Sequence, residues 1–252
     1  MKRQRLVILI LASLASVAVV ALLGLNAVRS GRAEEGAPIL TYPDITPTAT
    51  IAPLPPSKPN TAASTLLSES FDSPDALAHW EILNPPDIMP EDQANWEVQD
   101  GVLRQTGTGA AHDPNINETM AVTGDASWTN YTISAKVYDQ ENATFGLVAR
   151  RQGNSFYRYR IIASSLSGTP KQVLEKVVDG VATPLATREA PGYEQRQWHT
   201  VALSVAGAAI RVSLDGAVVA EATDATLTSG QAGLYTRALG GIRFDDVTIT
   251  AP

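Results

Sequence analysis

The sequence predicts an all-β domain, a two-sheet antiparallel jelly-roll sandwich, preceded by one N-terminal transmembrane helix and a disordered linker. Three observations predict the sandwich. Short segments with alternating apolar and polar residues fill residues 66–252, and Asp-Gly dipeptides separate several of them. No amphipathic helical segment of useful length interrupts them. Many short strands joined by short turns favour two packed antiparallel sheets.

Residues 1–32 predict a membrane anchor. A basic N-terminus precedes an uncharged apolar run at residues 6–25, and such a run spans about 30 Å as a helix. Cleavable signal peptides usually have a shorter apolar region, of about 7–15 residues, and residues 26–33 offer only a poor cleavage site. We therefore expect a retained single-pass anchor with a cytoplasmic N-terminus and an extracytoplasmic C-terminal domain. A cleaved signal peptide is the alternative, and it would make the protein secreted.

Residues 33–65 predict a disordered linker. The segment is rich in Pro and Thr and carries few large apolar side chains. Pro favours an extended polyproline conformation, and a segment with so few apolar side chains cannot form a core. Residues 66–252 then form the folded domain, which is long enough to bury one core.

Three Asp-Gly dipeptides predict β-hairpins in the folded domain. Tight two-residue turns need positive φ at both positions, which Asp and Gly tolerate. One short helix is expected over residues 75–80, because Ser73 and Pro74 are typical helix-start residues. The three dipeptides are Asp100-Gly101, Asp179-Gly180 and Asp215-Gly216.

Charge and cysteine content exclude several function classes. Residues 66–252 carry 13 Lys or Arg and 23 Asp or Glu, a net charge of −10. Such a domain repels polyphosphate, so we expect no nucleic-acid partner. The chain has no Cys, which excludes disulfides, a Cys-ligated zinc site and a thiol nucleophile.

A series of short motifs stands in one order along residues 66–252. Together they resemble the concanavalin A-like lectin/glucanase superfamily, and within it the laminin-G-like and 3-keto-disaccharide-hydrolase-like jelly rolls of bacterial extracellular proteins. The resemblance implies the fold and says little about the ligand, because unrelated functions share this fold. The motifs lie at residues 70–72, 80, 96–103, 128–133, 146–151, 198–201, 212–216 and 244–247.

We expect no catalysis by this chain. Family 16 glycoside hydrolases share the resembled fold and carry their catalytic carboxylates on one strand with the spacing Glu-x-Asp-x-(x)-Glu. This spacing is absent from the sequence. The carboxylate pair Glu175 and Asp179 is expected at a solvated strand end, and the histidines show no pairing with a serine and an acid. We expect His199 to point outward from a strand.

Residues 150–160 are the strongest candidate for a ligand-binding surface. The segment concentrates four Arg and two Tyr in an acidic domain. The resemblance implies that strands here line a concave sheet, where such side chains suit polysaccharide, uronate or a peptide strand. A surface ladder of Arg paired with cross-strand acids is the alternative. The candidate residues are Arg150, Arg151, Tyr157, Arg158, Tyr159 and Arg160, with Tyr and Arg on opposite faces of the strand, and His112 from the loop at residues 107–119.

The four tryptophans are expected in the core. Trp80, Trp96, Trp128 and Trp198 fall where the resembled family has inward-facing aromatic residues. Core packing is therefore favoured over a role in sugar stacking.

A calcium site is a further expectation from the resemblance. The opening and closing strands of the resembled fold pair, which would bring together Glu69, Asp72, Asp245 and Asp246. Clustered carboxylates need a compensating charge, and a structural Ca²⁺ held by Glu69, Asp72 and Asp246 would supply it. Solvated acids, or pairing with Arg243, are the alternatives.

These observations predict a membrane-tethered extracytoplasmic domain of a bacterium that binds carbohydrate or another cell-surface polymer without hydrolysing it. The alternative is a protein-interaction module, such as the ectodomain of a sensor or adhesion complex. A glycoside-active enzyme is the third hypothesis, and the missing carboxylate spacing argues against it.

Overall fold

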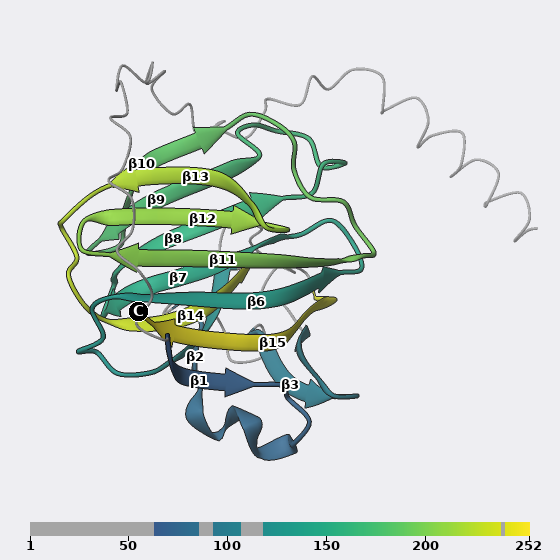
Figure 1. Ribbon diagram of the computed structural model, residues 1–252. Helices are drawn as coiled ribbons and strands as arrows, with labels where there is room; N and C mark the ends of the chain where they lie inside the picture. Colours follow the sequence, from purple (N-terminus) through teal and green to yellow (C-terminus); the bar gives the residue numbers. More distant parts are fainter. Residues whose placement is uncertain (1–62, 86–92, 107–117, 238–239) are drawn as a thin grey trace, which may run out of the picture. The chain divides into compact units, whose positions relative to one another are not determined.

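The computed structural model describes residues 63–85, 93–106, 118–237 and 240–252 (Figure 1). These residues belong to one compact unit of the chain, Ser57–Pro252. The anchor expected at residues 1–32 and most of the linker expected at residues 33–65 lie outside the described residues. Among the residues that are described, no helix is long and apolar enough to cross a membrane.

Two antiparallel β-sheets enclose one main core in the described part of the chain. One short 3-10 helix, η1 (Pro74–His79), accompanies them. The all-β, two-sheet antiparallel architecture expected from the sequence is therefore confirmed. The strands are β1 (Ser64–Glu69), β2 (Glu81–Leu83), β3 (Asn95–Gln99), β4 (Val102–Thr106), β5 (Glu118–Thr123), β6 (Tyr131–Asp139), β7 (Thr144–Gln152), β8 (Ser155–Ile162), β9 (Gln172–Val178), β10 (Val181–Arg188), β11 (Trp198–Ala206), β12 (Ala209–Leu214), β13 (Ala217–Thr223), β14 (Gln231–Arg237) and β15 (Ile242–Ala251).

Strands that are distant in sequence lie side by side in both sheets. The eight-stranded sheet has the order β13-β12-β11-β6-β15-β4-β3, and β1 pairs with β15 beside this path. The seven-stranded sheet has the order β10-β9-β8-β7-β14-β5-β2, and in Figure 1 most of it lies behind the first sheet. The expected pairing of the opening and closing strands is confirmed, with Glu69 opposite Val247.

All three Asp-Gly dipeptides form the expected hairpin turns. They join β3 to β4, β9 to β10, and β12 to β13. Both residues of each turn have positive φ, for example 55° at Asp100 and 72° at Gly101, as the tightest hairpin turns require. The expected short helix is η1, which Ser73 caps by accepting a hydrogen bond from the backbone N–H of Asp75.

Three of the four tryptophans contact the core, and two of these three are buried. Trp80 and Trp96 are 8% and 6% exposed, and Trp96 stacks on Phe244 with ring centroids 5.7 Å apart. Trp128 is half-buried, with its ring edge against Tyr131. The core position expected for Trp80 and Trp96 is confirmed.

Trp198 and His199 at the start of β11 have the opposite orientation to the one expected. Trp198 is 43% exposed, whereas His199 is buried at 6%. The core residues of β11 begin at Val201 and recur with period two, which places His199 inward and Trp198 outward. The expectations for both residues are therefore wrong. Successive side chains of a strand point to opposite faces, so an error of one residue in the predicted pattern exchanges the inward and outward residues.

Candidate ligand-binding site

Residues 150–160 span the β7–β8 hairpin in the seven-stranded sheet. On β8, alternation places Tyr157 and Tyr159 on one face and Arg158 and Arg160 on the other, as expected. Tyr157 and Tyr159 belong to the core between the sheets. Arg158 and Arg160 lie on the outer face of this sheet, where both donate hydrogen bonds to Glu175 of the neighbouring strand β9.

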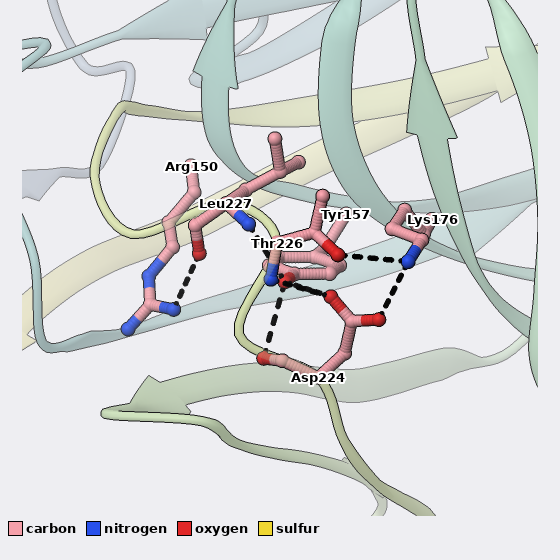
Figure 2. Close-up of polar contacts among 6 residues, drawn as sticks. All are labelled: Arg150, Tyr157, Lys176, Asp224, Thr226 and Leu227. Carbon is pink, nitrogen blue, oxygen red and sulfur yellow. Dashed lines mark hydrogen bonds and ion pairs between the residues drawn. The ribbon is translucent and has the colours of Figure 1, made fainter.

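Arg150 is an interior residue that ties separate segments together. It is 1% exposed. Its Nε donates to the carbonyl of Thr129 at 2.9 Å, and its Nη1 donates to the carbonyls of Gly207 and Leu227 at 2.9 and 2.8 Å. Figure 2 shows the bond to Leu227, which lies in the connection between β13 and β14. Arg150 therefore has a structural role.

Tyr157 fixes the same connection from the other side (Figure 2). Its hydroxyl donates to the carboxylate of Asp224 at 2.6 Å, and Lys176 Nζ donates to the second carboxylate oxygen at 2.7 Å. Burial raises the pKa of Tyr157 to about 12. Burial acts to raise the pKa of Asp224 as well, but the hydrogen bonds from Lys176 and Tyr157 outweigh it and hold that pKa well below its ordinary value.

Tyr159 is the third interior residue of the segment. It is 0% exposed, and its hydroxyl donates to Oε1 of Gln172 at 2.9 Å. Arg150, Tyr157 and Tyr159 were expected on a ligand-binding surface. The structure corrects this placement, because the polar atoms of all three are used by partners inside the fold.

Arg158 is the centre of a network on the outer face of the seven-stranded sheet. Its Nε donates to Oε1 of Glu175 at 2.7 Å, and its Nη1 donates to Oε2 of Glu118 at 2.7 Å. Its guanidinium also lies over the ring of Tyr235, with Cζ 4.5 Å from the ring centroid. Arg158 is only 6% exposed, so its charge depends on these two carboxylates and the aromatic face for compensation. We call Arg158, Glu175, Glu118 and Tyr235 the Arg158 network.

The bond between Arg158 and Glu118 crosses the sheet. Strands β8 and β5 are separated by β7 and β14. Neighbouring strands lie about 4.8 Å apart, so about 14 Å of sheet separates the two backbones. The two long side chains meet over the intervening strands. Gly146 of β7 allows the close approach of β8, because a side chain there would collide with the backbone carbonyl of Tyr159. Gly146 lies directly opposite both Tyr235 and Arg160.

Glu118 is the acid of the Arg158 network that is open to solvent. Its side chain is 39% exposed, whereas that of Glu175 is 0% exposed. The hydroxyl of Tyr235 donates to its Oε1 at 2.8 Å. Burial acts to raise the pKa of Glu118, but the charge and hydrogen bond of Arg158 and the hydrogen bond of Tyr235 outweigh it and lower that pKa below its ordinary value. Glu118 is thus an ionised carboxylate held in one orientation at the surface.

Apolar side chains pack with Tyr235 of the Arg158 network on the same face. Val148, Phe156, Val177 and Tyr235 form a small buried cluster separate from the main core, and Met120 packs against it. The four cluster residues are at most 7% exposed, so the apolar side chain of this group that reaches the surface is that of Met120.

The other two candidate ligand residues lie away from this centre. Arg151 lies near the end of β7, where its Nη1 donates to Oε1 of Gln231 at 3.0 Å and is 3.6 Å from a carboxylate oxygen of Glu81. His112 lies outside the described residues.

The residues expected to bind calcium make other contacts. Glu69 accepts from the backbone N–H of Phe71 at 3.0 Å, and a carboxylate oxygen of Asp246 lies 2.6 Å from Nζ of Lys136. Asp72 accepts a hydrogen bond from the side chain of Ser70. In the part of the chain that the structure describes, no group of three or more His, Asp or Glu side chains is placed to hold a metal ion. These residues as placed do not fit a calcium site, and calcium binding stays a prediction that melting with and without a chelator would test.

Comparison with known proteins identifies the family of this chain. Residues 94–252 match the model of the galactocerebrosidase C-terminal lectin domain. The chain belongs to this family. The matched range includes every residue of the Arg158 network.

Solved structures share the fold of this lectin-domain family member. The carbohydrate-binding module CBM66 from Bacillus subtilis matches with a TM-score of 0.52 and 16% identity, over 68% of this chain and 94% of that chain. The GH43 protein BlXynB from Bacillus licheniformis matches with a TM-score of 0.51 and 16% identity, over 73% of this chain and 39% of that chain. At these identities the similarity shows the fold alone. No sequence match was found among curated proteins.

Sequence reasoning missed most of the Arg158 network in this lectin domain. Glu118 and Tyr235 were not selected, and Glu175 was expected to be solvated although it is fully buried. One signal was present in the sequence. Glu175 stands between Val173 and Val177 on one face of a strand, and a carboxylate on an apolar face requires a nearby cation. The alternative of Arg paired with cross-strand acids is confirmed for Arg158.

Proposed function

We propose that this chain is a non-catalytic glycan-binding domain that uses the outer face of its seven-stranded sheet around Glu118. Membership of a lectin-domain family supports a carbohydrate ligand. The observation that carries the site is the fixed, ionised and solvent-open carboxylate of Glu118, which Arg158 and Tyr235 hold in place. The finer assignment to the concanavalin A-like superfamily is part of this proposal.

The chemistry of Glu118 suits a sugar ligand. An ionised carboxylate accepts hydrogen bonds at both oxygens, and the hydroxyl groups of a sugar are donors. Because Arg158 and Tyr235 already orient Glu118, a ligand does not have to order this side chain on binding. Met120 beside it provides an apolar contact for the C–H groups of the sugar.

The same contacts argue against hydrolysis at this site. Glycosidases need one carboxyl group that is protonated at working pH as the general acid. The contacts of Glu118 lower its pKa, which favours the ionised form. Glu175 accepts hydrogen bonds from Arg158 and Arg160 and is fully buried. We therefore propose binding without bond cleavage.

We further propose that the domain acts outside the cytoplasm and is tethered to the membrane of a bacterium. The support is the sequence of residues 1–65, an apolar run long enough to span a bilayer followed by a Pro-rich segment. Sequencing the N-terminus of the mature protein distinguishes a retained anchor from a cleaved signal peptide. Recovery of a protein that starts after residue 25 in the medium would contradict the anchor.

A glycan array probed with the full chain and with two variants tests the binding site. Glu118→Gln keeps the size of the side chain and removes its charge, and we expect it to weaken glycan binding about tenfold or more. The control is Glu221→Gln, which removes a partly exposed acid that pairs with Arg211 in the other sheet. We expect no change in binding from the control.

Two outcomes of this experiment would contradict the proposal. Release of sugar from a polysaccharide, abolished by Glu118→Gln, would show an enzyme. Retention of no glycan by the full chain, together with a protein partner recovered by cross-linking, would favour the interaction-module alternative.

A further inference from the structure

The exposed indole of Trp198 belongs to a row of planar side chains on the outer face of the eight-stranded sheet. Trp198 on β11 lies opposite Tyr138 on β6, and Tyr138 lies opposite Arg243 on β15. The ring centroids of Trp198 and Tyr138 are 5.5 Å apart, and Cζ of Arg243 lies 5.2 Å from the centroid of Tyr138. We call these three residues the Trp198 platform.

One side of this platform has no neighbouring strand. The pairing of β11 with β12 begins at Val201 opposite Leu214, so no β12 residue lies opposite Trp198. The indole is 43% exposed. Exposure of such an apolar ring to water is unfavourable, so a ligand that covers the indole gains affinity from the apolar surface it removes from water.

Two arginines beside the platform, Arg243 and Arg196, contact the same residue, Gln140. Arg243 Nη2 donates to Oε1 of Gln140 at 3.2 Å, and Arg196 Nε donates to the carbonyl of Gln140 at 3.3 Å. Among the described residues, neither guanidinium has a carboxylate oxygen within 4.0 Å, whereas Arg158 and Arg211 do. Two cations that have no acidic partner in the described part of an acidic domain favour an anionic ligand.

We propose that the Trp198 platform binds an acidic glycan, through a pyranose ring that carries a carboxylate. An aromatic face packs against the apolar C–H face of a pyranose, and the guanidinium fork of Arg243 matches a carboxylate with two hydrogen bonds. The inference rests on the proposed function, because it adds a second glycan site and names its charge class. The two sites lie on the outer faces of different sheets, so variants affect them separately.

Calorimetric titration of the full chain tests the platform. The probes are a galacturonic acid trisaccharide and the same trisaccharide with its carboxylates methyl-esterified. We expect Trp198→Ala, Arg243→Gln and esterification each to weaken binding about tenfold or more, because each removes either the stacking surface or the charge pair. Arg211→Gln is the matched control on the outer face of the same sheet, where Arg211 pairs with Glu221, and it leaves the affinity unchanged.

Four outcomes would overturn the inference. Trisaccharide binding that survives Trp198→Ala but is lost in Glu118→Gln would remove the platform and leave the proposed function intact. Equal affinity for the esterified form would remove the acid specificity. A lower sedimentation coefficient in Trp198→Ala, without an effect on sugar binding, would assign the platform to self-association. Failure to bind any glycan at all would overturn the proposed function as well.

Discussion

Two buried arginines in this fold link separate segments of the chain and contribute little charge to the surface. Arg150 joins backbone carbonyls from different segments, and Arg158 joins two carboxylates across a sheet. Both are at most 6% exposed. The effect of removing such a cation depends on what remains, because a buried carboxylate without its partner is much less stable than an apolar pair at the same place.

We therefore expect that removing Arg158 destabilises the fold chiefly because the buried carboxylate of Glu175 loses an ion-pair partner. Arg158→Met leaves the buried Glu175 with Arg160 as its remaining cation, and we expect the free energy of unfolding to fall by about 3–5 kcal/mol. The double variant Arg158→Met/Glu175→Leu replaces the pair by apolar side chains and should regain much of this loss. Urea unfolding of Arg158→Met, of Glu175→Leu and of the double variant measures the coupling free energy between Arg158 and Glu175. Strictly additive effects would contradict the proposed dependence.

The pH dependence of stability is expected to follow Glu118. Its pKa in the folded chain lies below the ordinary value, so the unfolded chain takes up a proton first as the pH falls. The stabilisation by Glu118 is thus fully present above about pH 4.3, the ordinary pKa of Glu, and is lost as the pH falls through the lower folded value. Melting temperatures of the wild type and Glu118→Gln should differ at pH 7 and converge in acid. A constant difference would show that the charge of Glu118 is not involved.

At the scale of elements, the connection between β13 and β14 passes from one sheet to the other and is held by side chains of the second sheet. Arg150, Tyr157 and Lys176 come from β7, β8 and β9, and they contact the connection at Asp224 and Leu227 (Figure 2). A crossover without regular structure needs such contacts, because its backbone polar groups have no strand partners.

Arg150→Met tests this role. The substitution keeps apolar volume and leaves the carbonyls of Thr129, Gly207 and Leu227 without their donor, so we expect a loss of about 2–4 kcal/mol in the free energy of unfolding. The control Arg211→Met removes an exposed ion pair and should change stability by less than about 1 kcal/mol. Weakened glycan binding with an unchanged melting temperature would instead restore the ligand-binding role first expected for Arg150.

At the scale of the whole domain, the closing strand β15 depends on two early strands that share one of its edges. β4 pairs with residues 242–244 of β15, and β1 pairs with residues 247–251. Without β1, half of one edge of β15 is unpaired, and unpaired edges promote association between chains.

Two truncations at the N-terminus separate the contribution of β1 to stability from that of the residues before Ser57. A chain that starts at Ser57 keeps the whole compact unit, and we expect it to melt at the temperature of the full chain. A chain that starts at Asp72 lacks β1, and we expect a lower melting temperature and a tendency to aggregate. Light scattering and circular dichroism measure both effects. Equal behaviour of the two truncated chains would show that β1 does not contribute to closure.

The sequence by itself determined the sheets, the hairpins and the faces of many strands. These features depend on local chemistry, namely alternation with period two and the positive φ that Asp and Gly tolerate in turns. The opposite faces of Tyr157 and Arg158 followed from alternation alone. The outward position of Trp198 was also present in the spacing of Val201, Leu203 and Val205, although the family resemblance suggested otherwise.

The tertiary structure alone decided which side chains meet. The Arg158–Glu118 bond joins residues 40 positions apart on strands that are not neighbours, and Arg150 contacts a carbonyl 77 positions away. Neither contact has a local sequence signal, because strand order in a sheet is independent of chain order. For the same reason, no pattern along the chain could show that Arg158 and Tyr235 hold Glu118 in place at the surface.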